Sequence, residues 1–422
     1  GHVMSKKKKL LIGGAVGILT VGLVFGGIKA YEYYQAKELV LTYEDITFPN
    51  IKVNEKDVSE ISKANLELVL KEEVEGLESR LIEVKIDDQT FSKTLKELGF
   101  VASEDVNELT DEIFALGKDL EILEQAKRIE AAPVVEYTIE YSYDESLVDE
   151  WIQSIAQQLY VDKEEPTFKM VSAGNFEVTE GHAGYSIDAD AIKEQVKTAL
   201  NEVSAETIEV TAEGIVDKQA KDPELLKSVN YKISTYSSSF PVGIPRSKNV
   251  ELATSKINKT LLMPGDEFSY TDKVSPVIYS NGYVDATIFV NAQPVNGVGG
   301  GICQVSSTLY NTVLLAGIMP TERRNHSLQV GYVPVGLDAT MAENAIDFKF
   351  VNTLDYPIYI NAYTSGGTLT IEFWSNEDAL DGVTYKPQVK QVGQNKYQTY
   401  LLGYDTNGSL VYNEYIDTST YK

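Results

Sequence analysis

The lone cysteine of this chain, Cys303, lies in a segment whose residue types suit nucleophilic chemistry. The segment reads Gly299-Gly300-Gly301-Ile302-Cys303-Gln304-Val305-Ser306-Ser307-Thr308-Leu309-Tyr310-Asn311, a glycine run followed by a predicted helix over 303–316. This order puts the thiol on the first helical turn, where backbone N–H groups and the helix dipole favour an anion. An unperturbed cysteine has a pKa of about 8.5, and a helix N-terminus lowers it. We therefore expect Cys303 to be an activated nucleophile.

A nucleophilic cysteine needs a base or an imidazolium partner. The chain has three histidines. We set His2 aside with the leading Gly1-His2-Val3 stretch as a cloning remnant, and His182 lies in a predicted solvated turn. This leaves His326, at the start of a strand predicted over 329–333, just after the Cys303 helix. The alternative is a histidine packed at a strand edge, because spacing alone does not establish contact.

A third group usually orients the imidazole in such sites. The residues near His326 that suit this role are Asp338, Asp347, Glu322 and Asn325. The sequence does not choose among them, and we take Asp338 as the first candidate.

Two further sets of residues are candidates for binding the substrate. The backbone at Gly301 and the side chains of Gln304 and Ser306 lie where an oxyanion would form. Arg246 and Arg323 have the guanidinium fork that holds a carboxylate, although solvent-facing arginines are the commoner case. One cysteine and two usable histidines are too few and too scattered for a zinc site, and we expect no metal and no cofactor.

Charge and length limit the class of protein. The 422 residues carry a net charge of −26, which would repel phosphate backbones and argues against nucleic acid as a partner. About 390 residues follow the N-terminal apolar stretch, too many for one ordinary domain. The sequence does not indicate an oligomeric state.

The N-terminus predicts a membrane anchor. Lys6 to Lys9 form a basic cluster, and residues 10–28 are uncharged and long enough to span a bilayer. The basic flank predicts a cytoplasmic N-terminus, with the rest of the chain facing outward from a single-pass plasma-membrane helix. A cleaved signal peptide is the alternative, but no small-residue cleavage site follows the apolar run.

Hydrophobic periodicity predicts an α+β chain of several parts. A helix–strand–helix pattern recurs at a spacing of about 90 residues, which suggests a degenerate duplication. Within it, 81–86 is predicted as a strand and 91–98 as a helix. Short strands and turn signals dominate beyond residue 223, which predicts a mostly antiparallel sheet with the Cys303 helix laid on it. The expected parts are a remnant and basic tail (1–9), a transmembrane helix (10–28), a tether (29–48), two related units (49–132 and 133–218), a catalytic domain (229–376) and a C-terminal β extension (377–422).

The segment around Cys303 closely resembles the signature of the VanW family. Supporting stretches include Pro264-Gly265-Asp266-Glu267-Phe268-Ser269, His326-Ser327, Tyr332-Val333-Pro334, Asp338-Ala339-Thr340 and Asp347-Phe348. The resemblance runs from about Tyr231 to Trp374, and the upstream units resemble the peptidoglycan-binding repeats that often precede VanW domains. The chain departs from the family pattern at Arg324-Asn325, just before His326.

The resemblance implies a function at the cell wall. Some membrane-anchored members of the family are described as L,D-transpeptidases that cross-link peptidoglycan stem peptides through a cysteine. It implies that Cys303 is the nucleophile and that His326 is the family's histidine. A Cys/His hydrolase of stem peptides and a non-catalytic wall-binding scaffold are the alternatives.

Overall fold

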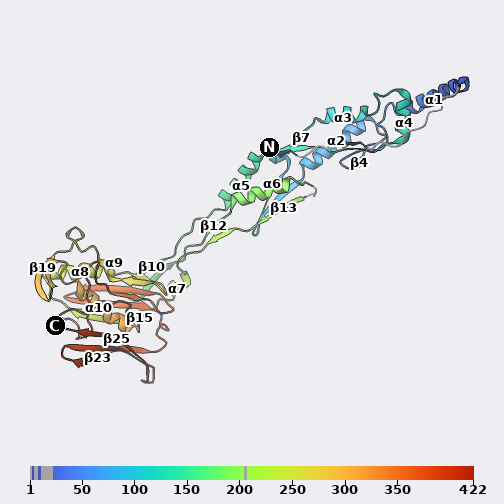
Figure 1. Ribbon diagram of the computed structural model, residues 1–422. Coiled ribbons are helices and arrows are strands. Elements are labelled where there is room, and N and C mark those ends of the chain that lie inside the picture. The colour runs from blue at the N-terminus through green and yellow to red at the C-terminus, as the bar shows by residue number, and fades with distance from the viewer. Residues whose placement is uncertain (1, 4–7, 11–21, 204–206) are drawn as a thin grey trace. The chain divides into compact units, whose positions relative to one another are not determined.

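The computed structural model describes residues 2–3, 8–10, 22–203 and 207–422 (Figure 1). The chain divides into two compact units, and each is described by itself. The first contains Gly1–Asp162 and Gly184–Asp217, and the second contains Lys163–Ala183 and Lys218–Lys422. Both mix helices with strands, which confirms the expected α+β class. The finer domain boundaries given above stay predictions.

The expected transmembrane helix over 10–28 is wrong. Residues 11–21 of that stretch lie outside the described residues. Leu10 ends strand β2 (Lys8–Leu10), which pairs with β8 (Val135–Tyr137). Helix α1 spans Gly22–Thr42 and carries charged residues from Lys29 onward, which interrupt its apolar character. No helix within the described ranges is both long enough and apolar enough to cross a membrane, and this overturns the predicted single-pass plasma-membrane location.

The first unit has one hydrophobic core beneath small sheets and helices. Aspartate caps start several helices: Asp105 and Asp188 accept hydrogen bonds from backbone N–H groups of α3 and α6. The elements after α1 are β3 (Ile51–Val53), β4 (Lys56–Asp57), α2 (Lys63–Glu78), β5 (Leu81–Ile86), β6 (Gln89–Thr94), η1 (Lys96–Leu98), β7 (Val101–Ala102), α3 (Val106–Ala115), α4 (Ile122–Ala131), β8, β9 (Tyr141–Tyr143), α5 (Glu145–Leu159), β12 (Gly184–Ser186), α6 (Ala189–Leu200), β13 (Thr207–Ala212) and β14 (Ile215–Asp217).

Two observations refine the sequence-based view of this unit. Strand β5 has the predicted bounds, but the first half of the helix predicted over 91–98 is strand β6, in which Phe91 lies opposite Val84. Only Lys96–Leu98 are helical, as the short helix η1. Pairing with β5 in a hairpin outweighs the helical spacing of the apolar residues. Strand β13 runs parallel to β5, with Ile208 opposite Ile82, so segments assigned to two separate repeats share one sheet.

The second unit is built on a four-stranded antiparallel sheet of order β15-β22-β21-β16. Helix α10 packs on it: Ser234 donates to the Thr312 carbonyl across 2.9 Å, and the Ser238 and Thr308 hydroxyls lie 2.8 Å apart. The elements are β10 (Thr167–Ser172), β11 (Asn175–Thr179), α7 (Pro223–Lys227), β15 (Tyr231–Ser239), α8 (Pro245–Ile257), β16 (Leu261–Leu262), β17 (Glu267–Ser269), α9 (Tyr270–Val274), η2 (Tyr279–Asn281), β18 (Asp285–Val290), β19 (Gln293–Val298), α10 (Ile302–Leu315), β20 (Lys349–Val351), β21 (Ile358–Ser365), β22 (Thr368–Ser375), β23 (Thr384–Gly393), β24 (Lys396–Tyr404) and β25 (Leu410–Thr420).

Helix α10 is buried on almost every side. All of its residues except Cys303 and Leu315 are classed as buried, including polar ones such as Asn311 and Thr312. A helix enclosed on all sides holds its first turn firmly, because the surrounding side chains fix its axis. Cys303 is therefore carried by a rigid element.

The C-terminal residues form a three-stranded antiparallel sheet, β23-β24-β25 (Figure 1). The turn between β24 and β25 includes Asn407-Gly408, with Gly408 at a φ of 81°. Tyr385 of β23 packs against Gly317, just beyond the end of α10. The extension is thus part of the same packed unit as the helix that carries Cys303.

Candidate active site

The glycine run before α10 shapes the start of the helix. Gly301 is the N-cap residue and has a φ of 109°, a conformation that L side chains rarely adopt. At Gly300, a Cβ atom would lie 2.5 Å from the carbonyl oxygen of Thr287 on β18. The glycines therefore allow the strand backbone to approach the first turn, where Cys303 is the second residue.

The Cys303 thiol is partly exposed and surrounded by polar groups. Its Sγ lies 3.5 Å from Oγ1 of Thr340 and 3.7 Å from the carbonyl oxygen of Met341. Burial opposes ionisation, but the hydrogen bond with His326 and the charge of that imidazole outweigh it, so the pKa of Cys303 is lowered. The thiolate predicted for a helix N-terminus is favoured here mainly by the histidine.

His326 lies between the thiol and a carboxylate. Its Nδ1 is 2.7 Å from Oδ2 of Asp338, and its backbone N–H donates to the same oxygen across 2.7 Å. Burial lowers the pKa of His326, but the hydrogen bonds with Asp338 and Cys303 dominate and raise it to about 9. With Nδ1 bound to Asp338, Nε2 is left for the thiol. Both shifts favour a thiolate beside an imidazolium.

The position of His326 differs from the sequence-based expectation in one respect. The segment 329–333 is not a strand, and His326 belongs to an irregular connection between α10 and β20. Two hydrogen bonds to Asp338, rather than a sheet ladder, fix this residue. The other candidates for the third group contact something else: Asp347 accepts from the N–H of Thr271, and Glu322 accepts from the N–H of Asp347. Asn325 donates to backbone carbonyls.

Asp338 is almost fully enclosed, with 1% of its side chain exposed. Burial raises the pKa of a carboxyl group, yet the hydrogen bonds from His326 and Tyr421 outweigh it and the pKa of Asp338 is lowered. Arg323 adds a positive charge 3.6 Å from Oδ1. Asp338 is therefore an ionised, oriented carboxylate.

A cavity of about 450 Å³ opens beside the thiol. Cys303, His326, Arg246 and the glycine run line it together with apolar side chains. The other lining residues are Val277, Thr287, Ile288, Phe289, Val298, Ile302, Gln304, Val330, Tyr332, Thr340, Met341, Ala342 and Glu343. Five of the eight predicted site residues, Gly301 and Gln304 included, thus meet at one cavity.

Arg246 and Gln304 are linked. Nη2 of Arg246 donates to Oε1 of Gln304 across 2.8 Å, and the guanidinium lies 5.7 Å from the centre of the Tyr332 ring. The Gln304 amide nitrogen donates to the Ser238 hydroxyl and the Ser239 carbonyl, so this amide is already engaged within the protein. Gln304 therefore holds Arg246, rather than presenting its amide to an oxyanion as expected.

Ser306 and Arg323 do not line the cavity. The Ser306 hydroxyl donates to the Ala339 carbonyl across 2.6 Å and thereby fixes the loop after Asp338. Only 2% of the Arg323 side chain is exposed, and Nε donates to the Asp338 carbonyl across 2.9 Å. We expected both at the substrate, but the structure places them beneath the site.

Three residues that the sequence analysis did not assign to the site lie next to it in the structure. Tyr332 has its hydroxyl 3.4 Å from Nε2 of His326, and Thr340 contacts the thiol. Both lie in stretches that resemble family motifs, which was a signal for them. Tyr421 donates a short hydrogen bond to Oδ1 of Asp338 from the end of the chain, and no motif marks it.

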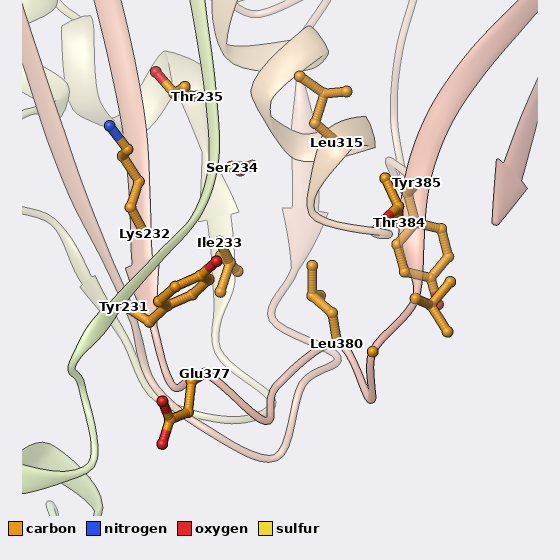
Figure 2. A pocket seen from close by; sticks show the side chains of 12 residues that line it. Tyr231, Lys232, Ile233, Ser234, Thr235, Leu315, Glu377, Leu380, Thr384 and Tyr385 are labelled. Carbon is orange, nitrogen blue, oxygen red and sulfur yellow. The ribbon is translucent and has the colours of Figure 1, made fainter. Parts of the chain in front are cut away.

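A second cavity of about 410 Å³ lies elsewhere in this unit and shares no residue with the first (Figure 2). Its charged side chains are Lys232 and Glu377, beside Tyr231, Leu315 and Leu380. None of the predicted site residues lies there. No group of three or more His, Cys, Asp or Glu side chains placed to hold a metal occurs in the part of the chain that the structure describes.

Comparison with known proteins assigns the region that holds this site. The family model described as "VanW like protein" matches residues 245–374, and the one described as "Putative peptidoglycan binding domain" matches residues 91–209. A Bacillus subtilis protein, "Uncharacterized protein YoaR", is 34% identical over 202 residues, which cover 47% of this chain and 66% of the relative. The chain belongs to the VanW family.

Other similarities are more distant. The "Vancomycin B-type resistance protein VanW" of Enterococcus faecalis is 28% identical over 147 residues, or 33% of this chain and 54% of that protein. The chain thus spans about two thirds of one curated relative and about half of the other. A crystal structure of an Enterococcus faecium L,D-transpeptidase C442S mutant is 11% identical, and the match covers 55% of this chain and 75% of that one with a TM-score of 0.18. That score is too low to carry an argument. The two family matches support a cell-wall-related function for this VanW protein.

Proposed function

We propose that this VanW protein is a cysteine acyltransferase that cross-links peptidoglycan stem peptides as an L,D-transpeptidase. One observation carries the proposal: Nδ1 of His326 is hydrogen-bonded to Asp338, and the same imidazole lowers the pKa of Cys303, with which it lines a cavity. A thiolate, an imidazolium and an orienting carboxylate are the groups that acyl transfer through a cysteine requires.

In the first half-reaction the Cys303 thiolate attacks the carbonyl carbon that follows the third residue of a donor stem. A C–S bond forms, and the C–N bond to the terminal D-alanine breaks. The His326 imidazolium gives its proton to the departing nitrogen, which leaves as an amine. The N–H groups of Ile302 and Gln304 already donate to the Gly299 and Gly301 carbonyls, so we assign the oxyanion of the tetrahedral intermediate to the Cys303 N–H at the first turn of α10.

In the second half-reaction a side-chain amine of a neighbouring stem attacks the thioester. A C–N bond forms, the C–S bond breaks, and the amine proton passes to His326. The thiolate and the imidazolium are restored, so no further reactant is consumed. Asp338 keeps the imidazole oriented in both steps and stays ionised because it is hydrogen-bonded throughout.

Arg246 is proposed to hold the donor's terminal carboxylate. It lines the cavity with Cys303, and it is a fixed positive charge in a chain with a net charge of −26. Burial lowers the pKa of Arg246, while the neighbouring Tyr332 and Cys303 raise it, and an arginine remains charged at neutral pH. Gln304 occupies one donor of the guanidinium, so the fork has others for a ligand.

The experiment incubates the full chain with purified disaccharide tetrapeptides and identifies products by mass spectrometry. The proposal expects cross-linked dimers together with free D-alanine. If the products are tripeptides and no dimers form, the enzyme is a hydrolase of stem peptides and not a transpeptidase. The enzymatic proposal would be overturned if no turnover is seen and if Cys303→Ala binds isolated sacculi as well as the unaltered protein does. That result would favour a wall-binding scaffold.

A further inference from the structure

The C-terminal extension contacts the buried side of the proposed active site. The VanW match ends at residue 374, before β23, β24 and β25 begin. Yet the end of β25 runs along the connection that carries His326. The Asn325 side chain donates to the Thr420 carbonyl across 3.0 Å, and the N–H of Lys422 donates to the Ser327 carbonyl across 2.8 Å. The two residues that flank His326 are therefore both tied to the chain's last residues.

We propose that Tyr421 is a positioning residue for the His326–Asp338 pair, supplied to the VanW domain by its C-terminal sheet. Tyr421 is 5% exposed, and its hydroxyl donates to Oδ1 of Asp338. The same hydroxyl accepts from the N–H of Gly336 across 3.0 Å. Oδ2 of Asp338 faces His326, so the tyrosine holds the carboxylate oxygen that the histidine does not use.

Asp417 of β25 provides a second link between the C-terminal sheet and Asp338. Asp417 pairs with Nη1 of Arg323 across 3.1 Å, while Nε of Arg323 donates to the Asp338 backbone carbonyl. Tyr421 itself is held by its N–H, which donates to the Asn395 carbonyl across 2.9 Å, and by the Tyr397 ring. The side chain of Asp338 is thus bound by Tyr421 and its backbone carbonyl by Arg323, and both partners are positioned by β25.

The physical role follows from the direction of the O–H dipole. The hydroxyl that donates to Asp338 places the positive end of its dipole at the carboxylate. This partly offsets the negative charge that stabilises the His326 imidazolium, and so it lowers the pKa of His326. The titratable groups that act on His326 and Asp338 are Cys303, Tyr310, Arg323, Tyr332 and Tyr421. Among these, Tyr421 donates directly to the carboxylate without lining the cavity, so it acts on the reaction only through Asp338.

The test measures the titration of His326 in the full chain by NMR of labelled histidine. The chain has three histidines, and His326→Gln assigns the relevant signal. Tyr421→Phe removes only the hydroxyl and is expected to move the pKa of His326 upward from about 9. Tyr415→Phe removes a hydroxyl from the exposed face of the same strand, where it contacts Thr418, and should leave the titration unchanged. An unchanged or lower value in Tyr421→Phe overturns the inference.

A double variant tests whether Tyr421 acts through Asp338. In an Asp338→Asn background, Tyr421→Phe should produce no further shift of the His326 titration, because the carboxylate is already gone. If Tyr421→Phe does not fold, Asp338→Asn should restore folding, because the buried side chain that has lost its tyrosine partner is then neutral. A further shift, or a fold that the second change does not restore, would also overturn the inference.

The inference rests on the proposed function for its meaning, but this test does not need a substrate. A shifted titration in a protein without transfer activity would keep the positioning role and reject the transpeptidase. In an active protein, Tyr421→Phe should lower kcat by about tenfold at unchanged KM, part of the usual contribution of acid–base catalysis. Unchanged kcat together with unchanged titration would reject the positioning role alone.

Discussion

Nδ1 of His326 and Oδ2 of Asp338 lie 2.7 Å apart, and the backbone N–H of the histidine reaches the same oxygen at the same distance. Two donors of one residue thus converge on one carboxylate oxygen. This fixes both the ring and the backbone of His326 in a connection that has no regular secondary structure. The arrangement leaves the other ring nitrogen for Cys303.

Replacing the nucleophile should stop transfer without unfolding the protein. A serine hydroxyl at position 303 is far less acidic than a thiol, so the variant does not hold a preformed anionic nucleophile beside His326. We expect Cys303→Ser to lower the rate of dimer formation by roughly a thousandfold or more. The assay is mass spectrometry of the muropeptide products, with circular dichroism and the Tm as controls for folding. A rate close to that of the unaltered protein would reject Cys303 as the nucleophile.

The thiol should react quickly at neutral pH. Cys303 is the only cysteine of the chain, so alkylation by iodoacetamide reports this residue alone. Because its pKa is lowered, the rate at pH 7 should exceed that of a cysteine model peptide, and it should fall as the pH falls through the lowered pKa. In urea the protein should react as slowly as a cysteine model peptide, since the histidine contact is lost. Equal rates for folded protein and peptide would contradict thiolate activation.

The rate of transfer should decline on the alkaline side. The pKa of His326 is raised to about 9, so the imidazolium acid is present below that pH and is lost as the pH rises through it. Alkylation should not decline there, because the thiolate persists above pH 9. The measurement compares the two pH profiles on the same protein. Profiles that decline together would mean that loss of the thiolate, or unfolding, causes the alkaline limb.

Loss of the guanidinium should weaken substrate binding more than chemistry. Arg246→Gln removes the charge that we place at the donor carboxylate, and KM should rise by about 10- to 100-fold, as for a charged hydrogen bond of 1.5–3 kcal/mol. Lys248 lies on the same helix, α8, with an exposed side chain, so Lys248→Gln is the matched control for net charge. Steady-state kinetics with tetrapeptide donor give both constants. An unchanged KM in Arg246→Gln would remove Arg246 from the binding site.

A methyl group in the glycine run should destabilise the second unit. The Cβ atom of Gly300→Ala would lie 2.5 Å from the Thr287 carbonyl oxygen, and a backbone atom cannot turn away as a side chain can. We expect a loss of about 1–3 kcal/mol in the free energy of unfolding. Gly331→Ala is the control, because nothing lies within 4 Å of its Cβ position. Thermal denaturation gives the Tm of both variants. Equal Tm values would contradict the prediction and would show that β18 shifts to accommodate the methyl group.

Much of the second unit follows from local sequence. The glycine run and the apolar spacing predict a helix over 303–316, and α10 spans Ile302–Leu315. Short strands are predicted beyond residue 223, and β15, β21 and β22 lie there. These elements are set by periodicity and by turn residues a few positions apart, which the sequence displays directly. Cys303 as the candidate nucleophile follows from the same local signals.

The partners of the nucleophile were settled by tertiary structure. Four residues suited the place beside His326, and only folding brings Asp338 to it while Asp347 and Glu322 turn to other backbone groups. Arg323 reads as a substrate ligand in sequence but is buried beneath the site. The apolar run at the N-terminus predicted a spanning helix, whereas the described residues contain no helix suited to that. The sequence by itself determined the candidate nucleophile and the helix that carries it, because those depend on neighbours in the chain. Which side chains surround the thiol depends on contacts between distant segments, down to Tyr421, and no local pattern records such contacts.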